Sequence, residues 1–326
     1  MRVRFWGTRG SIPVALTGAA IRDKIVAALV AAAARGIDTP DKARVFVDQE
    51  LDFTVSSTFG GNSSCVELVT GRDDYVLCDL GSGARAFGNH VLATRGPTGH
   101  TFHVFMSHLH WDHIMGFPFF MPAYIPGNRI HIYGGHPALV EAFRRQHAAP
   151  SFPVDFGRLG ADIEFTRLET ERDYALAGLA VRAKRQLHSG DSFGYRFEQA
   201  GKVVVYSTDS EHKRDDPAET DTFVAFFRGA DLVIFDAMYS LAEAISVKED
   251  WGHSSNVMGV ELCQLAGVKH LCMFHHEPVH DDARLAAILR ETRMPAVQIQ
   301  PCVTAAADAP RVAHAVAVAL GRFFAG

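Results

Sequence analysis

Apolar and polar residues alternate, or form short apolar runs, in a pattern that predicts β-strands along much of the chain. At the N-terminus, Val3 and Phe5 alternate with arginines until the segment Gly7–Pro13 breaks the strand with turn residues. Later runs such as Leu232–Phe235 are continuously apolar, which is typical of a buried strand. Further strands are predicted at 64–69, 75–80, 101–106, 129–133, 180–187, 192–197, 202–207 and 270–274.

Helical periodicity occupies the intervals between these strands. An alanine-rich segment at about 17–35 carries its larger aliphatic residues, Ile21 to Val30, on one stripe. A second helix is predicted to start at Pro40, with Thr39 as N-cap, and to run towards Leu51. Further helices are predicted at 84–93, 139–147, 257–266, 281–291 and 310–324. Strands followed by helices, twice over and without a break in composition, predict one domain over residues 1–326, an α/β fold with two sheets between helices.

The composition is that of a globular protein with a large core. Apolar residues make up 48% of the 326 and charged residues 21%. A net charge of −5 and a pI near 6.4 provide no basic field for a large nucleic acid or an anionic membrane, so neither partner is expected. The five cysteines form no C-x-x-C pair, and the chain contains neither a signal-peptide pattern nor an apolar run long enough to span a bilayer. We therefore expect a reducing, cytoplasmic location.

The densest group of chemically active residues follows the predicted strand 101–106. His108, His110, Asp112 and His113 lie within six residues directly after that apolar run. Imidazole and carboxylate groups are ligands that suit zinc and neighbouring metals, and the end of a strand holds them rigidly. The cluster therefore predicts a metal site.

Three single polar residues occupy the same kind of position later in the chain. His188, Asp209 and His275 each come where a predicted strand ends. Strand ends in layered α/β folds form a common rim, where sites are usually built. Alone, each is more often an ordinary hydrogen-bonded residue than a ligand. Together with the cluster they supply five histidines and two aspartates, enough for two metals with one carboxylate to bridge them.

The H-x-H-x-D-H cluster, followed by a His, an Asp and a His each after a strand, resembles the metallo-β-lactamase superfamily. The fold of that superfamily is a four-layer αββα sandwich with its metal site at one edge. The resemblance implies two metal ions that share a bridging carboxylate. It assigns His108, His110 and His188 to one ion, Asp112, His113 and His275 to the other, and Asp209 to the bridge.

A shorter and less distinctive motif, Gly252-His253-Ser254, narrows the resemblance to one branch of the superfamily. It is similar to the Gly-His-Ser motif of ribonuclease Z and related phosphodiesterases, in which this histidine helps the leaving oxygen depart. Alternatively, His253 only precedes the N-cap of the next helix. The segments Phe5–Pro13, Gly60–Cys65 and Asp79–Gly83 also resemble a branch of small phosphodiesterases that includes phosphoribosyl cyclic phosphodiesterase. The chain has no recognisable Gly/Pro-rich arm of the kind that ribonuclease Z uses to grip tRNA.

These patterns predict a dinuclear phosphodiesterase. The cofactors are two divalent ions, with Zn²⁺ favoured and Mn²⁺ as the alternative. A metal-bound hydroxide would attack phosphorus, and the resemblance implies that Asp112 orients it. A protonated His253 would stabilise or protonate the leaving alkoxide. The expected partner is a small phosphodiester, such as a cyclic nucleotide or a sugar cyclic phosphate. The alternatives are an acyl hydrolase, such as a lactonase or a β-lactamase, and a non-catalytic metal-binding sensor.

Other features of the sequence allow two interpretations. Arg9 and Ser11 either contact phosphate or only shape a turn. The aromatic residues at 117–124 either stack on a base or fill the core. The helical pair at about 15–55 is an insertion relative to the small members of the family. Three roles are open for this insertion: a lid over the pocket, a contact for a homodimer, or a solvated addition. The tail from Thr304 also departs from the family pattern.

Overall fold

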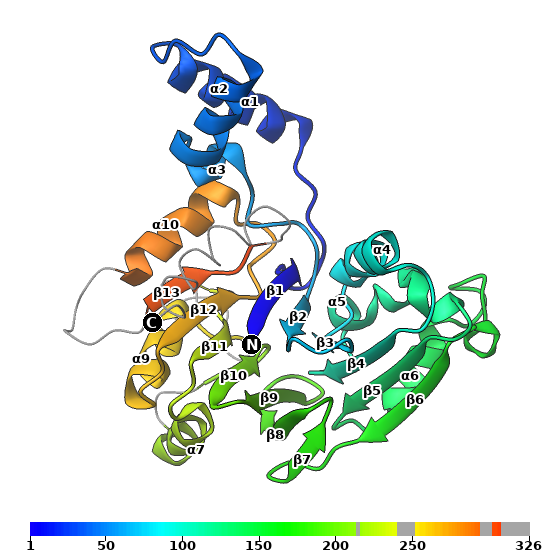
Figure 1. Cartoon of the computed structure of the whole chain (residues 1–326). Helices are drawn as coiled ribbons and strands as arrows, with labels where there is room; N and C mark the ends of the chain where they lie inside the picture. The colour runs from blue at the N-terminus through cyan, green and yellow to red at the C-terminus, as the bar shows by residue number, and fades with distance from the viewer. Residues whose placement is uncertain (213–215, 240–251, 294–301, 308–326) are drawn as a thin grey trace.

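Two β-sheets form the centre of the structure, a computed structural model that describes residues 1–212, 216–239, 252–293 and 302–307 (Figure 1). The strands of the first sheet are, in order, β1 (Arg2–Gly7), β2 (Cys65–Val69), β3 (Tyr75–Cys78), β4 (Thr101–Met106), β5 (Arg129–Gly134) and β6 (Asp162–Arg167). Those of the second are β7 (Asp173–Leu176), β8 (Leu179–Gln186), β9 (Ser192–Gln199), β10 (Lys202–Ser207), β11 (Leu232–Asp236), β12 (His270–Phe274) and β13 (Cys302–Ala305).

Helices cover the outer face of each sheet. The helices on the first sheet are α4 (Gly83–Arg95), α5 (Trp111–Ile114) and α6 (Leu139–Gln146), with 3₁₀ turns at Phe117–Phe119, Met121–Tyr124 and Phe156–Arg158. Those on the second are α7 (Pro217–Phe227), α9 (Asn256–Leu265) and α10 (Asp282–Arg293). The predicted αββα sandwich is confirmed. Among the described residues, no helix combines the length and the apolar character needed to cross a membrane.

Three hydrophobic layers explain the apolar runs of the sequence. Strand β11 shows the pattern, because Ile234 lies in the layer between the sheets while Phe235 lies under the outer helices. A strand buried on both faces needs apolar residues at consecutive positions. On the first sheet, Phe105 faces the central layer and Phe102 packs under α4 with Phe87.

Within each sheet, the strands that precede the candidate ligands run in the same direction, and β8 and β10 do so because each pairs antiparallel with β9 between them. Strand β4 pairs in parallel with β3 and β5, and β10, β11 and β12 pair in parallel with one another. Their carboxyl ends therefore meet along one edge of the sandwich, where polar residues can converge.

The sequence patterns do not predict β6, β7, β13 or helix α7. Strands β6 and β7 lie at the edges of their sheets and are largely half-buried or exposed, so their apolar signal is weak. Helix α7 does carry start signals, because Asp216 caps it and Pro217 occupies its first turn. The helix predicted at 310–324 lies outside the described residues.

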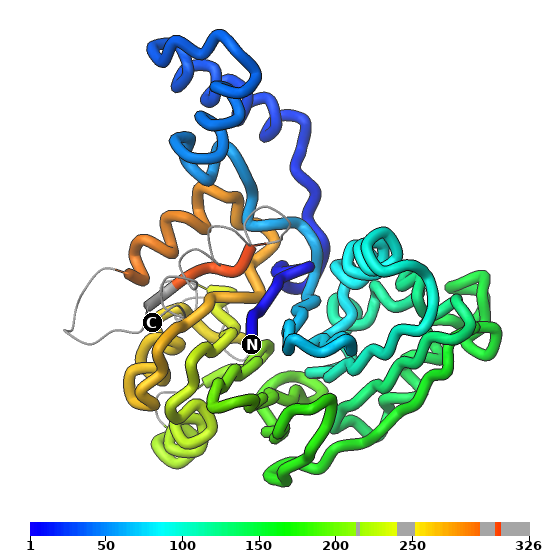
Figure 2. Tube along the Cα trace, in the orientation of Figure 1, coloured from blue at the N-terminus to red at the C-terminus, as the bar shows by residue number. Residues whose placement is uncertain are grey.

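The helical insertion lies between β1 and β2 and projects from the sandwich beside α10 (Figure 2). It comprises α1 (Gly18–Ala32), α2 (Pro40–Val45), a π-helical turn (Phe46–Glu50) and α3 (Phe53–Ser56). Thr17 and Thr39 cap α1 and α2. The second helix is shorter than predicted, because Leu51 N–H bonds the carbonyl of Phe46 and widens the last turn.

Candidate metal centre

The seven predicted ligands all lie at the same edge of the sandwich, and local backbone geometry aims them inwards. His110 immediately precedes α5, whose first turn carries Asp112 and His113. Asp209 follows β10 and His275 follows β12, both with left-handed backbone, at φ 48° and 58°. Such conformations cost energy in residues other than glycine and often occur at functional sites.

Asp112, His113 and His275 bring three donor atoms into mutual contact. Nε2 of His113 lies 3.3 Å from Nε2 of His275, and Asp112 Oδ2 lies 3.2 Å from each nitrogen. A tetrahedral ion with bonds of about 2.0–2.1 Å has ligand atoms about 3.3 Å apart. The three atoms therefore have the spacing of one coordination shell.

A second group consists of His108, His110 and His188. The ligand nitrogens of these three residues lie within 4.8 Å of one another. Nε2 of His188 lies 3.2 Å from Nδ1 of His110. Nε2 of the buried His108 has no hydrogen-bond partner among the described residues. A buried nitrogen without a partner is costly, and a metal ion in this group would satisfy it.

Asp209 lies between the two groups. One carboxylate oxygen, Oδ2, is 3.5 Å from His108 Nε2 and 3.3 Å from His275 Nε2. The other, Oδ1, is 3.3 Å from His113 Nε2. The carboxylate can thus reach ions in both groups, as a bridge requires.

Two of the imidazoles, those of His113 and His188, are held from behind by hydrogen bonds at Nδ1. His113 Nδ1 lies 2.7 Å from the Asp79 carboxylate, and His188 Nδ1 lies 2.8 Å from the carbonyl of Gly252. Because each acceptor takes the proton on Nδ1, the lone pair remains on Nε2, the atom that faces the other donors. This arrangement is usual for histidines that bind metals.

The charges at this edge also suit a cation. Burial alone would raise the pKa of Asp112, but the imidazole of His113 outweighs it and holds that pKa well below its ordinary value. Burial opposes ionisation of Asp209 too, and His275 and His113 hold its pKa low. Both carboxylates are at most 6% exposed, so a bound divalent ion would offset a charge that water does not reach.

His253 lies beside both donor groups. Its ring centroid is 5.0 Å from that of His188 and 5.0 Å from that of His275. Its Nδ1 lies 2.8 Å from Oδ2 of Asp236, the last residue of β11. Burial would lower the pKa of His253, but the Asp236 carboxylate outweighs it and the pKa rises to about 9. The N-cap of α9 is Ser255, not His253.

Comparison with known proteins decides the family. The family model described as the beta-lactamase superfamily domain matches residues 75–276, which include all seven candidate ligands and His253. The chain belongs to the β-lactamase superfamily. It is 24% identical over 255 residues to a ribonuclease Z from Limosilactobacillus fermentum, a match that covers 66% of this chain and 81% of the relative.

Solved structures show that the superfamily fold extends over nearly the whole chain. The metallo-β-lactamase fold protein YhfI from Bacillus subtilis has a TM-score of 0.62 at 17% identity, covering 94% of this chain and 96% of that one. A diphosphatase of the PhnP family has a TM-score of 0.58 at 19% identity, over 94% and 95%. The short form of human tRNase Z has a TM-score of 0.56 at 21% identity, over 94% and 97%. The resemblance seen in the sequence is confirmed.

Two acidic residues that support this superfamily site were not among the sequence candidates. Asp79 is fully buried and accepts hydrogen bonds from Ser107, His113 and Tyr206. Asp236 holds His253. Both follow the rule that identified the other candidates, a carboxylate where a strand ends, and Asp79 also has left-handed backbone at φ 60°. Applied to every strand, that rule would have found them.

The contacts of Arg9 and of the Ser11 backbone support the structural interpretation of this turn. The buried guanidinium of Arg9 donates to the carbonyls of Gly60 and His280, so it ties loops together. The backbone N–H of Ser11 donates to Asp112 Oδ2 at 2.8 Å, so this turn positions a candidate ligand. Gly10 is required there, because a Cβ would lie 2.5 Å from the His275 ring.

The aromatic segment after the cluster belongs mostly to the core. Phe117 and Phe120 are fully buried, and the Tyr124 hydroxyl donates to the carbonyl of Pro118. Phe119 is 54% exposed and contacts Phe152 edge-on. His276 is buried against the carbonyl of Ala306 and is therefore a structural neighbour of His275.

Proposed function

We propose that this protein is a dinuclear metal-dependent phosphodiesterase that cleaves a small cyclic nucleotide or sugar cyclic phosphodiester. His108, His110 and His188 would hold one divalent ion, and Asp112, His113 and His275 the other, with Asp209 shared. Nitrogen and oxygen donors in this number suit Zn²⁺, and Mn²⁺ is the alternative. The arrangement of Asp209 between the two groups supports two ions over one.

When bound, two such ions lower the pKa of a shared water and offset the charge on the phosphate oxygens. The side chains around them position the reactants. The N–H of Ser11 donates to Asp112 Oδ2, the oxygen that faces His113 and His275, so the second carboxylate oxygen can accept a hydrogen bond from the attacking water. A small displacement of that carboxylate would misalign the attack.

The observation that carries the proposal is the Asp236–His253 pair beside the candidate ligands. An alkoxide leaves phosphorus poorly unless it is protonated or its charge is offset. The Asp236 carboxylate raises the pKa of His253, which favours the protonated form of the imidazole that a proton donor needs. Asp236 occupies Nδ1, so Nε2 is the nitrogen that can donate to the leaving oxygen. The imidazolium also attracts an anionic phosphodiester. A neutral lactone would gain nothing from this charge.

The relatives and the charge of the chain support the choice of substrate. The names ribonuclease Z and PhnP-family diphosphatase both denote reactions at phosphorus. The net charge of −5 disfavours a long polyanion such as tRNA, and a small phosphodiester carries little charge to repel. The relatives and the charge of the chain therefore favour a small phosphodiester over a long one.

Paired substrate panels test the proposal. Protein loaded with Zn²⁺ or Mn²⁺ is assayed with bis(p-nitrophenyl) phosphate and with nitrocefin and lactones, and its metal content is measured by mass spectrometry. We expect turnover of the phosphodiester. Rates with cyclic mononucleotides, cyclic dinucleotides and ribose cyclic phosphates are then compared to find the preferred substrate. Cleavage of lactams or lactones alone would replace the proposal with an acyl hydrolase. Stoichiometric metal without turnover in either panel would favour a sensor.

A further inference from the structure

Helix α1 has a surface that a soluble monomer does not normally expose. Its only charged residues are Arg22, Asp23 and Lys24, and none of its residues is buried by the described part of the chain. Leu29 is 66% exposed and Val30 is 71% exposed. A helix that is apolar on nearly all sides is normally buried. The expected stripe therefore exists but lacks a covering layer among the described residues.

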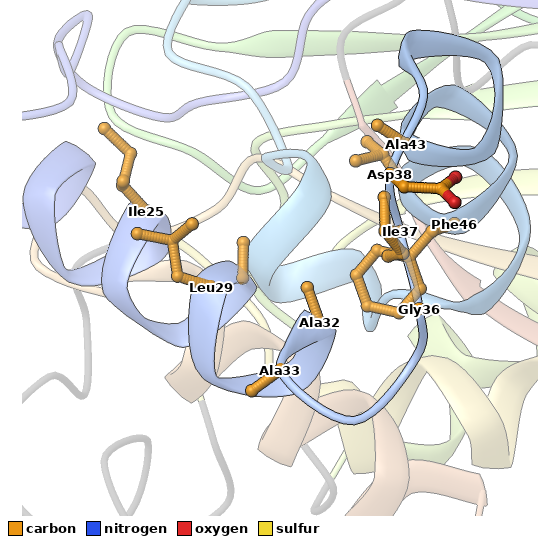
Figure 3. Close-up of a pocket in the computed structure, with 11 residues that line it drawn as sticks. Ile25, Leu29, Ala32, Ala33, Gly36, Ile37, Asp38, Ala43 and Phe46 are labelled. Atoms are coloured by element: carbon orange, nitrogen blue, oxygen red, sulfur yellow. The ribbon is translucent and has the colours of Figure 1, made fainter.

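This helix also forms one wall of a groove. The groove has a volume of about 650 Å³ and lies between α1 and the segment 36–47 (Figure 3). Ile25, Leu29 and Ala32 line it from α1, and Ile37, Ala43 and Phe46 line it from the other side. Apart from Asp38, its lining side chains are apolar. The insertion thus offers an apolar hollow next to an apolar ridge, formed by Val26 and Val30.

The insertion is anchored firmly enough to act as a platform. Lys24 Nζ lies 2.8 Å from Asp282 Oδ2, at the start of α10, and also donates to the carbonyls of Thr54 and Ser57. Asp282 in turn accepts from the N–H of Phe59. These bonds fix the inner side of α1 against the sandwich. A solvated addition would not need them, and they leave the apolar side facing outwards.

We propose that the insertion is a homodimer interface, in which the ridge of α1 in each copy packs into the groove of a second copy. Hollow and ridge lie on the same element, so a two-fold axis satisfies both at once, as a closed isologous interface requires. The alanines in the wall allow the two helices to approach closely. A lid over the metal centre is not needed to explain the exposed apolar residues.

Charge favours a second copy over other partners. Residues 18–56 carry five basic and six acidic side chains, a net charge of −1. The charges at the rim pair within the copy, as in Lys42–Asp38 at 2.7 Å and Arg35–Glu50 at 2.8 Å. A membrane-binding helix would be rich in unpaired basic residues, and an acidic or basic partner would need an opposite field. Two copies of a near-neutral surface can pack together without electrostatic repulsion.

The size of the surface lies near the lower limit for a specific dimer. Helix α1 is about 22 Å long, and with the neighbouring segment the patch is about 20 Å wide, from helix dimensions. The projected footprint is about 450 Å² per copy, and relief from side chains raises the accessible area towards the lower limit of specific interfaces, about 600 Å² per copy. We therefore expect dissociation in the micromolar range.

Sedimentation equilibrium of the full chain across the micromolar range tests the proposal. Wild type is expected to dimerise. Leu29→Asp and Val30→Asp, at positions exposed in the monomer, should each raise the dissociation constant at least about 100-fold, because a charge would be buried in both halves of the interface. The matched control is Leu265→Asp, at a leucine on α9 that is 67% exposed, which should leave the dissociation constant unchanged. Circular dichroism checks that each variant is folded, and Leu29→Gln is the milder replacement if Leu29→Asp is not.

The opposing outcomes are also measurable. A wild-type protein that remains monomeric throughout the range overturns the proposal. A dimer that both aspartate variants leave intact places the interface elsewhere and overturns it as well. A monomer that binds a fluorescent apolar dye, displaced by a fatty acid and lost in Leu29→Asp, would assign the groove to a small apolar ligand instead.

Discussion

Replacing Asp79 by asparagine changes one charge in the most heavily used carboxylate behind the metal centre. Oδ1 of Asp79 accepts from the N–H of Ser107 at 2.7 Å. Oδ2 accepts from Ser107 Oγ at 2.6 Å, His113 Nδ1 at 2.7 Å and Tyr206 OH at 2.7 Å. An asparagine has one acceptor oxygen and one donor nitrogen. In either orientation its NH₂ group must face at least one of these donors.

The magnitude follows from the four bonds. A hydrogen bond to a charged group contributes about 1.5–3 kcal/mol and a neutral one about 1 kcal/mol. With its oxygen in the Oδ2 position, Asp79→Asn loses the Ser107 N–H bond outright and weakens the other three. The free energy of unfolding should fall by about 3–5 kcal/mol. His113 also loses the charge that fixes its tautomer, so metal affinity should fall about 10- to 100-fold.

Metal titration monitored by calorimetry, together with urea unfolding, measures both effects. Tyr206→Phe is the control, because it removes one donor to Asp79 and leaves the His113–Asp79 bond in place. It should cost about 1.5–3 kcal/mol of stability, as for one hydrogen bond to a charged group, and leave metal affinity near wild type. Wild-type metal affinity in a folded Asp79→Asn protein would refute the argument that this carboxylate prepares His113 for a metal.

Three further predictions address the acid, the anchor and the core. The variant His253→Ala should keep its metal content but lose about 10²- to 10⁴-fold in kcat, because it lacks the proposed proton donor. The variant His110→Ala should lose both the metal and the activity. Unchanged turnover in His253→Ala would contradict the role of His253 as proton donor. Lys24→Met should lower the free energy of unfolding by about 2–4 kcal/mol, because the side chain of Asp282 is 5% exposed and would lack its cation. The control is Lys42→Met. It should have little effect on urea unfolding, because the pair between Lys42 and Asp38 is exposed. Burial lowers the pKa of His270 to about 4, so the unfolded chain binds a proton that the native protein does not, and stability falls by about 1.4 kcal/mol per unit as pH drops from about 6.5 to 4. His270→Leu should flatten the measured slope by that amount, and an unchanged slope would contradict the assignment.

The layers of the fold could be predicted from the sequence because burial on both faces leaves a direct trace. Strand β11 is apolar from Leu232 to Phe235, and α9 has helical periodicity. Each lies within a residue or two of its predicted position. Edge strands leave a weaker trace. In β6, exposed Asp162 and Glu164 alternate with half-buried Ile163 and Phe165, because only one face packs against anything.

The candidate ligands were predictable for a different reason. His108, His110, Asp112 and His113 are close in sequence, and a short cluster can be recognised without knowing the fold. The supporting residues have no such signal. The bond between His113 and Asp79 joins residues 34 positions apart, and it forms only because β3 and β4 lie side by side. Pairing of strands, rather than residue type, decides which buried aspartate supports a histidine.

The motif Gly252-His253 shows how a weak sequence signal can have a specific structural cause. Gly252 has left-handed backbone at φ 80°, and a Cβ would lie 2.4 Å from His188 Nδ1. Only glycine therefore lets this carbonyl approach and accept the proton of His188, a candidate ligand. The next residue in the same turn is His253, held by Asp236 beside both donor groups. One turn thus orients a candidate ligand through its backbone and the proposed acid through its side chain. The acid and the ligand cannot move independently, which explains why a three-residue pattern can indicate a reaction class that the ligands alone do not distinguish.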